Sequence, residues 1–293
     1  MFLLDRRSFL KIMGAGVAAS AMPNAALAST SADVFTADGN GAFVDSVVVM
    51  GEHSAVLIDA QFDMGNATRL ADTIAATGRT LDTILITHKH PDHVLGLEAI
   101  KTRFPNARVL AHPAILPEIE KTAQAYLDAF NSAAPAGVFA RKVVLPEALS
   151  ADHILLEGER IDVLEPMHGD TAQITPVHIP SLDTIVASDL LYSDTHLWVA
   201  ENTTPVLVDA WLASLDQLEA MGATTIIPGH RMDASVNDTS GFAKTRAYLA
   251  QWKSALDSTR DAAALKAAML TGNENLGFAL AVDRAVAAVY PNG

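Results

Sequence analysis

One short segment constrains this chain more than any other, the run Thr-His-Lys-His-Pro-Asp-His at 87–93. It closes the apolar stretch 81–87, which is bounded by turn residues and predicts a buried strand. A loop at the end of a strand can direct several side chains at one point. Imidazole and carboxylate groups are ligands that suit Zn²⁺, Fe²⁺ or Mn²⁺. The run therefore predicts a metal site, in preference to a solvated polar loop.

Short β-rich stretches and stretches with helical apolar spacing alternate along the chain. Strands are predicted at 43–50, 55–58, 81–87, 107–111, 154–156, 161–164, 175–179, 184–187 and 224–227, and helices at 66–77, 95–104, 116–130, 209–221, 244–256 and 261–270. Because β-rich stretches come first, then alternate with helices and then return, this order favours two sheets with helices outside them.

Composition removes several kinds of chemistry. The chain has 293 residues and no cysteine, which excludes disulfides, thiolate nucleophiles, cysteine zinc sites and iron–sulfur clusters. Its formal net charge of −14 disfavours nucleic acid and anionic lipid as partners. Beyond the N-terminus no run approaches the roughly 18 apolar residues that a membrane span needs. Histidine and aspartate are left as the residues that carry chemistry.

Residues 1–28 predict an export signal. The run Arg-Arg-Ser-Phe-Leu-Lys at 6–11 resembles the bacterial twin-arginine motif, with Asp5 where Ser or Thr is usual. A mildly apolar stretch and Ala-Leu-Ala at 26–28 complete the pattern. An ordinary secretory signal or an uncleaved anchor is the alternative. We expect the twin-arginine export machinery as a partner, a periplasmic location in a Gram-negative bacterium, and no stable membrane association after cleavage.

The pattern H-x-H-x-D-H after an apolar strand resembles the signature of the metallo-β-lactamase-fold hydrolases. That family has further ligands downstream, each after a strand, and His168, Asp189 and His230 fill these places here. The resemblance spans roughly residues 43–231. It implies an α/β fold, a four-layer αββα sandwich, for a domain of residues 29–293 whose C-terminal segment, about 231–293, is helical.

By this resemblance, seven side chains hold two divalent metal ions, with zinc first and iron or manganese open. One ion has His88, His90 and His168, the other has Asp92, His93 and His230, and Asp189 bridges them. Similarity to the glyoxalase-II and lactonase branch implies an exported hydrolase whose bridging hydroxide attacks a small carbonyl substrate. That substrate is an ester, lactone or thioester, with promiscuous β-lactam hydrolysis open.

Three further roles rest on the same resemblance. Asp92 could also accept the proton released on attack. Tyr192 has the offset of a tyrosine that contacts the substrate oxygen in lactone-hydrolysing members, although it could equally be a core or rim tyrosine. Asp59, at the end of a strand, could orient an imidazole or simply cap the strand.

Other functions stay open at this point. A dedicated β-lactamase is disfavoured, because two of its subclasses use a cysteine ligand and the third usually lacks the bridging aspartate. A mononuclear iron oxygenase of the same fold is the first alternative, and a non-catalytic metal-binding periplasmic protein is the second. The sequence leaves the particular substrate, the native metal and the oligomeric state open.

Overall fold

The structure, a computed structural model, describes residues 30–232 and 237–291. The predicted export signal therefore lies outside the described residues. The strands are β1 Ser31–Thr36, β2 Asp45–Met50, β3 Ser54–Ile58, β4 Thr80–Ile86, β5 Arg108–Ala111, β6 Glu147–Ala148, β7 His153–Leu156, β8 Glu159–Val163, β9 Val177–Ile179, β10 Thr184–Ser193 and β11 Thr225–Arg231. The helices are α1 Met64–Ala76, α2 Pro91–Val94, α3 Leu97–Arg103, α4 Leu116–Ala133, α5 Pro205–Glu219, α6 Ser240–Ser258, α7 Ala262–Leu270 and α8 Leu280–Val289.

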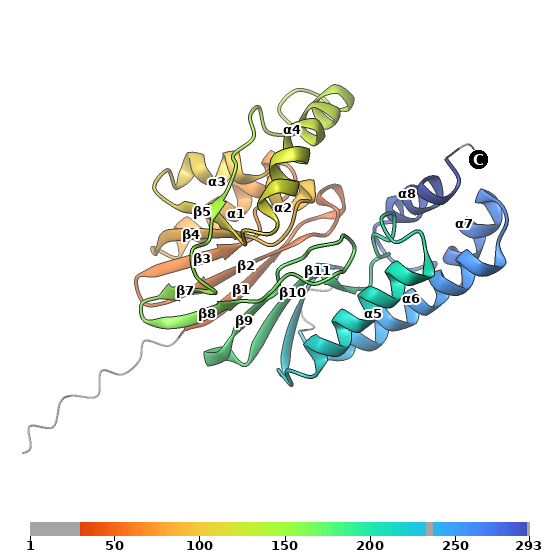
Figure 1. Cartoon of the computed structure of the whole chain (residues 1–293). Helices are drawn as coiled ribbons and strands as arrows, with labels where there is room; N and C mark the ends of the chain where they lie inside the picture. Colours follow the sequence, from red (N-terminus) through yellow and green to blue (C-terminus); the bar gives the residue numbers. More distant parts are fainter. Residues whose placement is uncertain (1–29, 233–236, 292–293) are drawn as a thin grey trace, which may run out of the picture.

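The strands form two sheets that lie face to face (Figure 1). The first has the order β1-β2-β3-β4-β5-β6, with antiparallel pairing at β1 and β2 and parallel pairing from β3 onwards. The second has the order β11-β10-β9-β8-β7, in which β10 and β11 run parallel. Helices α1 and α3 pack on the outer face of the first sheet, and α5 and α6 cover the second (Figure 1).

Alternation along the strands explains the four layers. In β2, Val47 and Val49 pack between the two sheets, whereas Val48 and Met50 face the helical layer of the first sheet. In β10, Val186 joins the layer between the sheets, and its two neighbours face the helices of the second sheet. Successive side chains of a strand point to opposite faces, so each sheet has two buried faces. The predicted αββα sandwich is confirmed.

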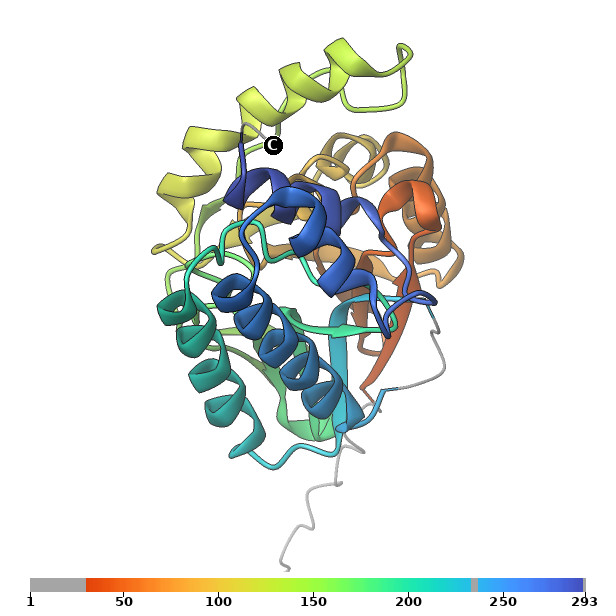
Figure 2. The same cartoon turned by 90° about the vertical axis from the view of Figure 1, so that its right-hand side faces the viewer.

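Helix α5, which precedes β11, and the helices after β11 form one body with the second sheet, as Figure 2 shows. Trp211 of α5 and Trp252 of α6 are fully buried, and Trp211 Nε1 donates a hydrogen bond to the Leu190 carbonyl of β10 at 3.0 Å. Buried apolar residues of α7 and α8 belong to the same cluster. The helical C-terminal segment is thus part of the core. Among the described residues, no helix is long and apolar enough to cross a membrane.

Three local features differ from the sequence-based expectation. The strand β1 was not predicted, and β10 continues to Ser193 instead of ending at 187. The predicted helix 95–104 corresponds to α3, whereas the short helix α2 before it was not predicted, and Gly96 lies between the two. A Cβ on Gly96 would lie 1.9 Å from the Ala60 carbonyl oxygen, so the close approach of these two segments requires glycine there. This approach sets α2 directly beside the end of β3.

Candidate metal centre

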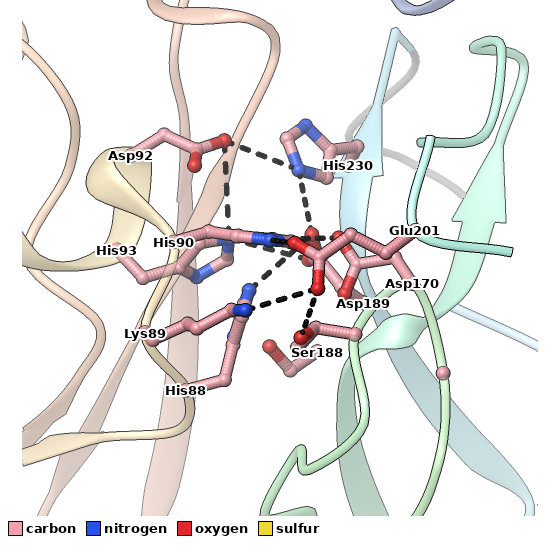
Figure 3. A network of polar contacts seen from close by, with 12 residues as sticks. His88, Lys89, His90, Asp92, His93, Asp170, Ser188, Asp189, Glu201 and His230 are labelled. Atoms are coloured by element: carbon pink, nitrogen blue, oxygen red, sulfur yellow. Dashed lines mark hydrogen bonds and ion pairs between the residues drawn. The ribbon is translucent and has the colours of Figure 1, made fainter. Parts of the chain in front are cut away.

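The segment after β4 supplies four polar side chains from a strand end, a short loop and one helical turn. His88 and His90 follow the strand, and Asp92 and His93 lie in α2. Pro91 occupies the first turn of α2, where its missing N–H is not needed. The turn of α2 rotates Asp92 and His93 towards the same space as His88 (Figure 3).

The second sheet and its loops supply the opposing side chains. Asp189 lies in β10 next to a register shift, His230 lies in β11, and Asp170 lies in the loop between β8 and β9. Gly229 of β11 leaves space for the side chain of Asp189, because a Cβ at position 229 would lie 1.8 Å from Asp189 Oδ1. Two groups of potential ligand atoms result, each within 4.8 Å: His88, His90, Asp170 and Asp189 in one, and Asp92, His93 and His230 in the other.

Asp189 belongs to the first group and also lies close to two histidines of the second. Its Oδ1 lies 3.2 Å from His93 Nε2, and its Oδ2 lies 3.1 Å from His230 Nε2 and 3.7 Å from His88 Nε2. Donors around one tetrahedral ion are about 3.3 Å apart when each bond is about 2.0–2.1 Å. His88 Nε2 and His93 Nε2 are buried without any hydrogen-bond partner. A pair of cations would satisfy these atoms, so the residues fit the metal ions that the fold family implies.

The far sides of three imidazoles are held by protein acceptors. His93 Nδ1 donates to Asp59 Oδ2 at 2.8 Å, and His230 Nδ1 donates to the Ala42 carbonyl at 2.8 Å. His88 Nδ1 lies 3.0 Å from Thr87 Oγ1. A proton on Nδ1 leaves Nε2 as a free electron pair, which is the form a metal ligand needs. Asp59 therefore lies where the sequence analysis expected an orienting carboxylate.

His90 presents Nδ1 to the centre, whereas the other three histidines present Nε2. Its Nδ1 faces Asp170 Oδ2 at 2.9 Å, and its Nε2 donates to Glu201 Oε1 at 2.8 Å. Glu201 also accepts from Lys89 Nζ at 2.9 Å and from Thr171 Oγ1 at 2.8 Å. The carboxylate of Glu201 thus directs His90 Nδ1 into the centre. Sequence reasoning missed Glu201, because nothing in its local sequence marks it.

The electrostatics describe a site that attracts positive charge. Burial alone would lower the pKa of His90, but the carboxylates of Asp170 and Glu201 together outweigh it and raise this pKa to about 10. For His230, burial is likewise outweighed by Asp189 and Asp92 together, and the pKa rises to about 9. Burial raises the pKa of Asp170 to about 7. Burial lowers the pKa of His88 instead. Without cations, protons on His90, His93 and His230 balance the carboxylates, and bound metal ions would take over that balance.

His168 lies outside both groups of donors. The resemblance assigned it to the first ion, yet its Nε2 lies 2.8 Å from Asn202 Oδ1. Asp170, two residues later, stands beside His88 and His90 instead. The signal that could have found it is in the same short run, Gly169-Asp170-Thr171, which offers a second metal-binding side chain.

Tyr192 is 1% exposed and lies behind the carboxylates. Its hydroxyl is 2.9 Å from Asp189 Oδ2 and 3.1 Å from Asp170 Oδ2. Its ring stacks on His230 with centroids 4.9 Å apart. This geometry gives Tyr192 a positioning role towards the two carboxylates, while contact with a substrate oxygen stays a prediction.

The rim of the centre carries a stack of aromatic rings. Phe278, which precedes α8, stacks on His230 at 5.4 Å and on Trp198 at 6.2 Å. Trp198 in turn lies 6.1 Å from the ring of His90. Phe278, Trp198 and the Lys89–Glu201 ion pair are only partly buried. They place two apolar rings and one ion pair next to His90 and His230.

Fold and site together define a class, the αββα proteins that gather histidine and aspartate donors of both sheets at a metal centre. The profile of the Metallo-beta-lactamase superfamily matches residues 39–230, about two thirds of the sequence. The chain belongs to this superfamily. The match contains every described donor of the centre.

Curated relatives match a shorter stretch. The hydroxyacylglutathione hydrolase of Aeromonas salmonicida is 37% identical over 70 residues, which cover 23% of this chain and 26% of that protein. The same enzyme of Stenotrophomonas maltophilia is 38% identical over 73 residues, which cover 24% and 27%. The chain thus spans about a quarter of the length of these relatives.

Solved structures match over most of the chain. A metallo-beta-lactamase family protein from Thermus thermophilus has a TM-score of 0.59 and 21% identity, over 87% of this chain and 92% of that one. A metallo-beta-lactamase from Pontibacter korlensis has a TM-score of 0.54 and 17% identity, over 71% and 87%. At these identities the likeness establishes the fold.

Proposed function

We propose that this chain is a hydrolase that depends on two divalent metal ions and cleaves a small carbonyl substrate, namely an ester, a lactone or a thioester. The proposal rests on the two groups of buried donor atoms and on the contacts of Asp189 with both. Ions in two-metal hydrolases are about 3.5–4 Å apart, and one carboxylate can link them. We propose zinc first, with iron and manganese as the other candidates.

Bound ions would polarise the substrate carbonyl and supply a nucleophile from water near neutral pH. The residues of the chain do the rest. The side chain of Asp92 is 13% exposed, whereas those of Asp189 and Asp170 are 2% and 0% exposed. Asp92 is therefore the carboxylate that can accept a proton and pass it to solvent. Tyr192 holds the other two carboxylates from behind.

The rim supports a small substrate with an apolar and a polar part. Trp198 and Phe278 offer ring faces, and Lys89 and Glu201 offer an ion pair beside them. The relatives named hydroxyacylglutathione hydrolases favour a glutathione thioester as the first compound to try.

Acid release by the purified protein tests the proposal. The panel is a glutathione thioester, an acyl-homoserine lactone, simple aryl esters and a penicillin, each with and without a chelator. We expect turnover of one bond type that the chelator abolishes. Asp92→Asn should lower kcat by about 100-fold or more. Asp82→Asn, at an exposed position on β4, is the matched control and should behave as wild type. Equal turnover by both variants would contradict the role of Asp92.

Metal counting separates this proposal from its alternatives. Two metal ions per chain together with chelator-sensitive hydrolysis support the hydrolase. One iron per chain together with oxygen consumption would instead support the mononuclear oxygenase. Bound metal without turnover of any kind would favour a metal-binding protein.

We further propose that residues 1–28 direct export to the periplasm by the twin-arginine machinery. The support is the motif at 6–11 and the small residues at 26–28. Replacing Arg6 and Arg7 by Lys should retain the full-length chain in the cytoplasmic fraction of a Gram-negative host. Unchanged appearance of a shortened chain in the periplasm would contradict the proposal.

A further inference from the structure

The loop 167–171 presents two potential ligands, His168 and Asp170, and their side chains have different partners. Asp170 is fully buried and has one oxygen, Oδ1, without a hydrogen-bond partner. Its other oxygen lies 2.9 Å from His90 Nδ1. His168 is half-buried and faces Asn202. Of these two residues, only Asp170 places a donor atom among those of the first group.

Several contacts fix this register. The Asn202 side-chain amide donates to the carbonyls of Gly169 and Asp170 at 2.9 and 3.2 Å, and its oxygen lies 2.8 Å from His168 Nε2. Asn202 is fully buried, so these bonds are shielded from water.

Packing supports the same register. A Cβ on Gly169 would lie 2.5 Å from Ile174 Cδ1, 2.9 Å from Leu190 Cδ2 and 3.1 Å from the Asp189 carbonyl oxygen, so a residue with a side chain in this place would force these neighbours to shift. His168 cannot replace Asp170 without breaking this arrangement.

We propose that Asp170, and not His168, completes the ligands of the first ion, and that this tunes the centre towards harder cations. This rests on the two-metal centre of the proposed function. Each ion would then have two imidazoles, one carboxylate of its own and a share of Asp189. His88, His90 and Asp170 form one set, and His93, His230 and Asp92 form the other. Carboxylate in place of imidazole suits Mn²⁺, whereas imidazole suits Zn²⁺ and other later metals.

We expect this ligand set to change the ratio of Zn²⁺ to Mn²⁺ affinity more than the affinity for either ion alone. Zn²⁺ still binds more tightly than Mn²⁺ at most sites with nitrogen and oxygen ligands. The carboxylate of Asp170 narrows the difference between Zn²⁺ and Mn²⁺ affinity, because it adds negative charge and takes the place of a nitrogen donor. The two ion sites also become alike in donor type, so they should fill with similar affinity.

Metal titration of the purified full-length protein, without substrate, tests the proposal. Mn²⁺ is followed by electron paramagnetic resonance, and Zn²⁺ by competition with a chromophoric chelator. Asp170→His should shift the ratio of Zn²⁺ to Mn²⁺ affinity towards zinc on the order of ten-fold. Asp170→Asn, which is isosteric, should weaken one of the two Mn²⁺ sites by about 10- to 100-fold. His168→Gln should change neither ion's affinity by more than about two-fold.

Two results would overturn the proposal. One is the loss of a metal site in His168→Gln while Asp170→Asn keeps both. The other is an unchanged selectivity ratio in a folded Asp170→His protein, with folding checked by its melting temperature. Because no substrate is used, failure of hydrolysis on every compound of the panel would contradict the proposed function and leave this test intact.

Discussion

The hydrogen bond from His93 to Asp59 offers the sharpest test of how this centre is organised. Asp59 Oδ1 accepts from the Thr87 backbone N–H at 2.9 Å, and its Oδ2 accepts from Thr87 Oγ1 and His93 Nδ1, both at 2.8 Å. In Asp59→Asn the amide keeps one acceptor and presents N–H groups to the other two partners. His93 must then carry its proton on Nε2, which removes the electron pair that would face the metal.

The expected magnitude follows from these bonds. Loss of an orienting carboxylate typically costs about 10- to 100-fold in metal affinity, which corresponds to about 1.4–2.8 kcal/mol. One hydrogen bond to a charged group is also lost, so the free energy of unfolding should fall by about 1.5–3 kcal/mol. The measurements are a competition titration with a chelator for metal affinity and urea denaturation of the metal-free protein for stability.

A control variant separates the two effects. Asp63 caps α1, where its Oδ1 accepts from the Asn66 backbone N–H at 2.9 Å, and it belongs to neither donor group. Asp63→Ala should lower stability by about 1 kcal/mol and leave metal affinity unchanged. The reasoning is refuted if Asp59→Asn binds metal like the wild type, or if Asp63→Ala loses as much metal affinity as Asp59→Asn.

Three more predictions follow from contacts elsewhere. Gly229→Ala should displace Asp189 and reduce the bound metal to one ion per chain or fewer. Gly241→Ala is the control and should bind metal as wild type does, because a Cβ at position 241 meets its nearest neighbour at 4.0 Å. Elemental analysis measures the metal content of both variants. Glu201→Ala removes the acceptor of the neighbouring imidazole and should weaken metal binding about ten-fold, with unchanged titration curves as the contrary result. Glu157 accepts three backbone N–H bonds, which lower its pKa, so its stabilisation is present above the ordinary value and is lost as pH falls through the lowered one. The melting temperature of Glu157→Gln should therefore lie below that of the wild type at about pH 7 and match it at about pH 3. An equal difference in melting temperature at both pH values would contradict this.

Strand ends were the part of the site that sequence could locate. His88 directly follows the predicted strand 81–87, and Asp189 and His230 lie two and three residues beyond the predicted strands 184–187 and 224–227. A strand end therefore locates a side chain to within a few residues. The two-sheet fold followed from the same alternation. The side chain that we propose as the third ligand of the first ion was harder to find, because it belongs to a loop. Its register depends on the packing of Gly169 and on Asn202, which lies 33 residues further along the chain.

Glu201 and Phe278 could not be found from the sequence either, because each contacts a residue that is far away along the chain. Glu201 reaches His90, and Phe278 reaches His230, and neither pair shares a motif or a strand. Periodicity predicts which face of an element is buried, but it does not say which loop residue will meet that face. Such partners become visible only when the elements are assembled.

The ring of Phe278 ties the metal centre to the last part of the chain. Tyr192, His230 and Phe278 stack in sequence, and the segment that carries Phe278 pairs with Thr195 and precedes α8. During synthesis from the N-terminus, every donor of the centre therefore emerges before the residue that covers it. A ribosome-bound chain that ends just after β11 would have all seven donors and an uncovered His230. In this protein the arrival of Phe278, more than the appearance of the last ligand, sets the moment at which the centre is enclosed.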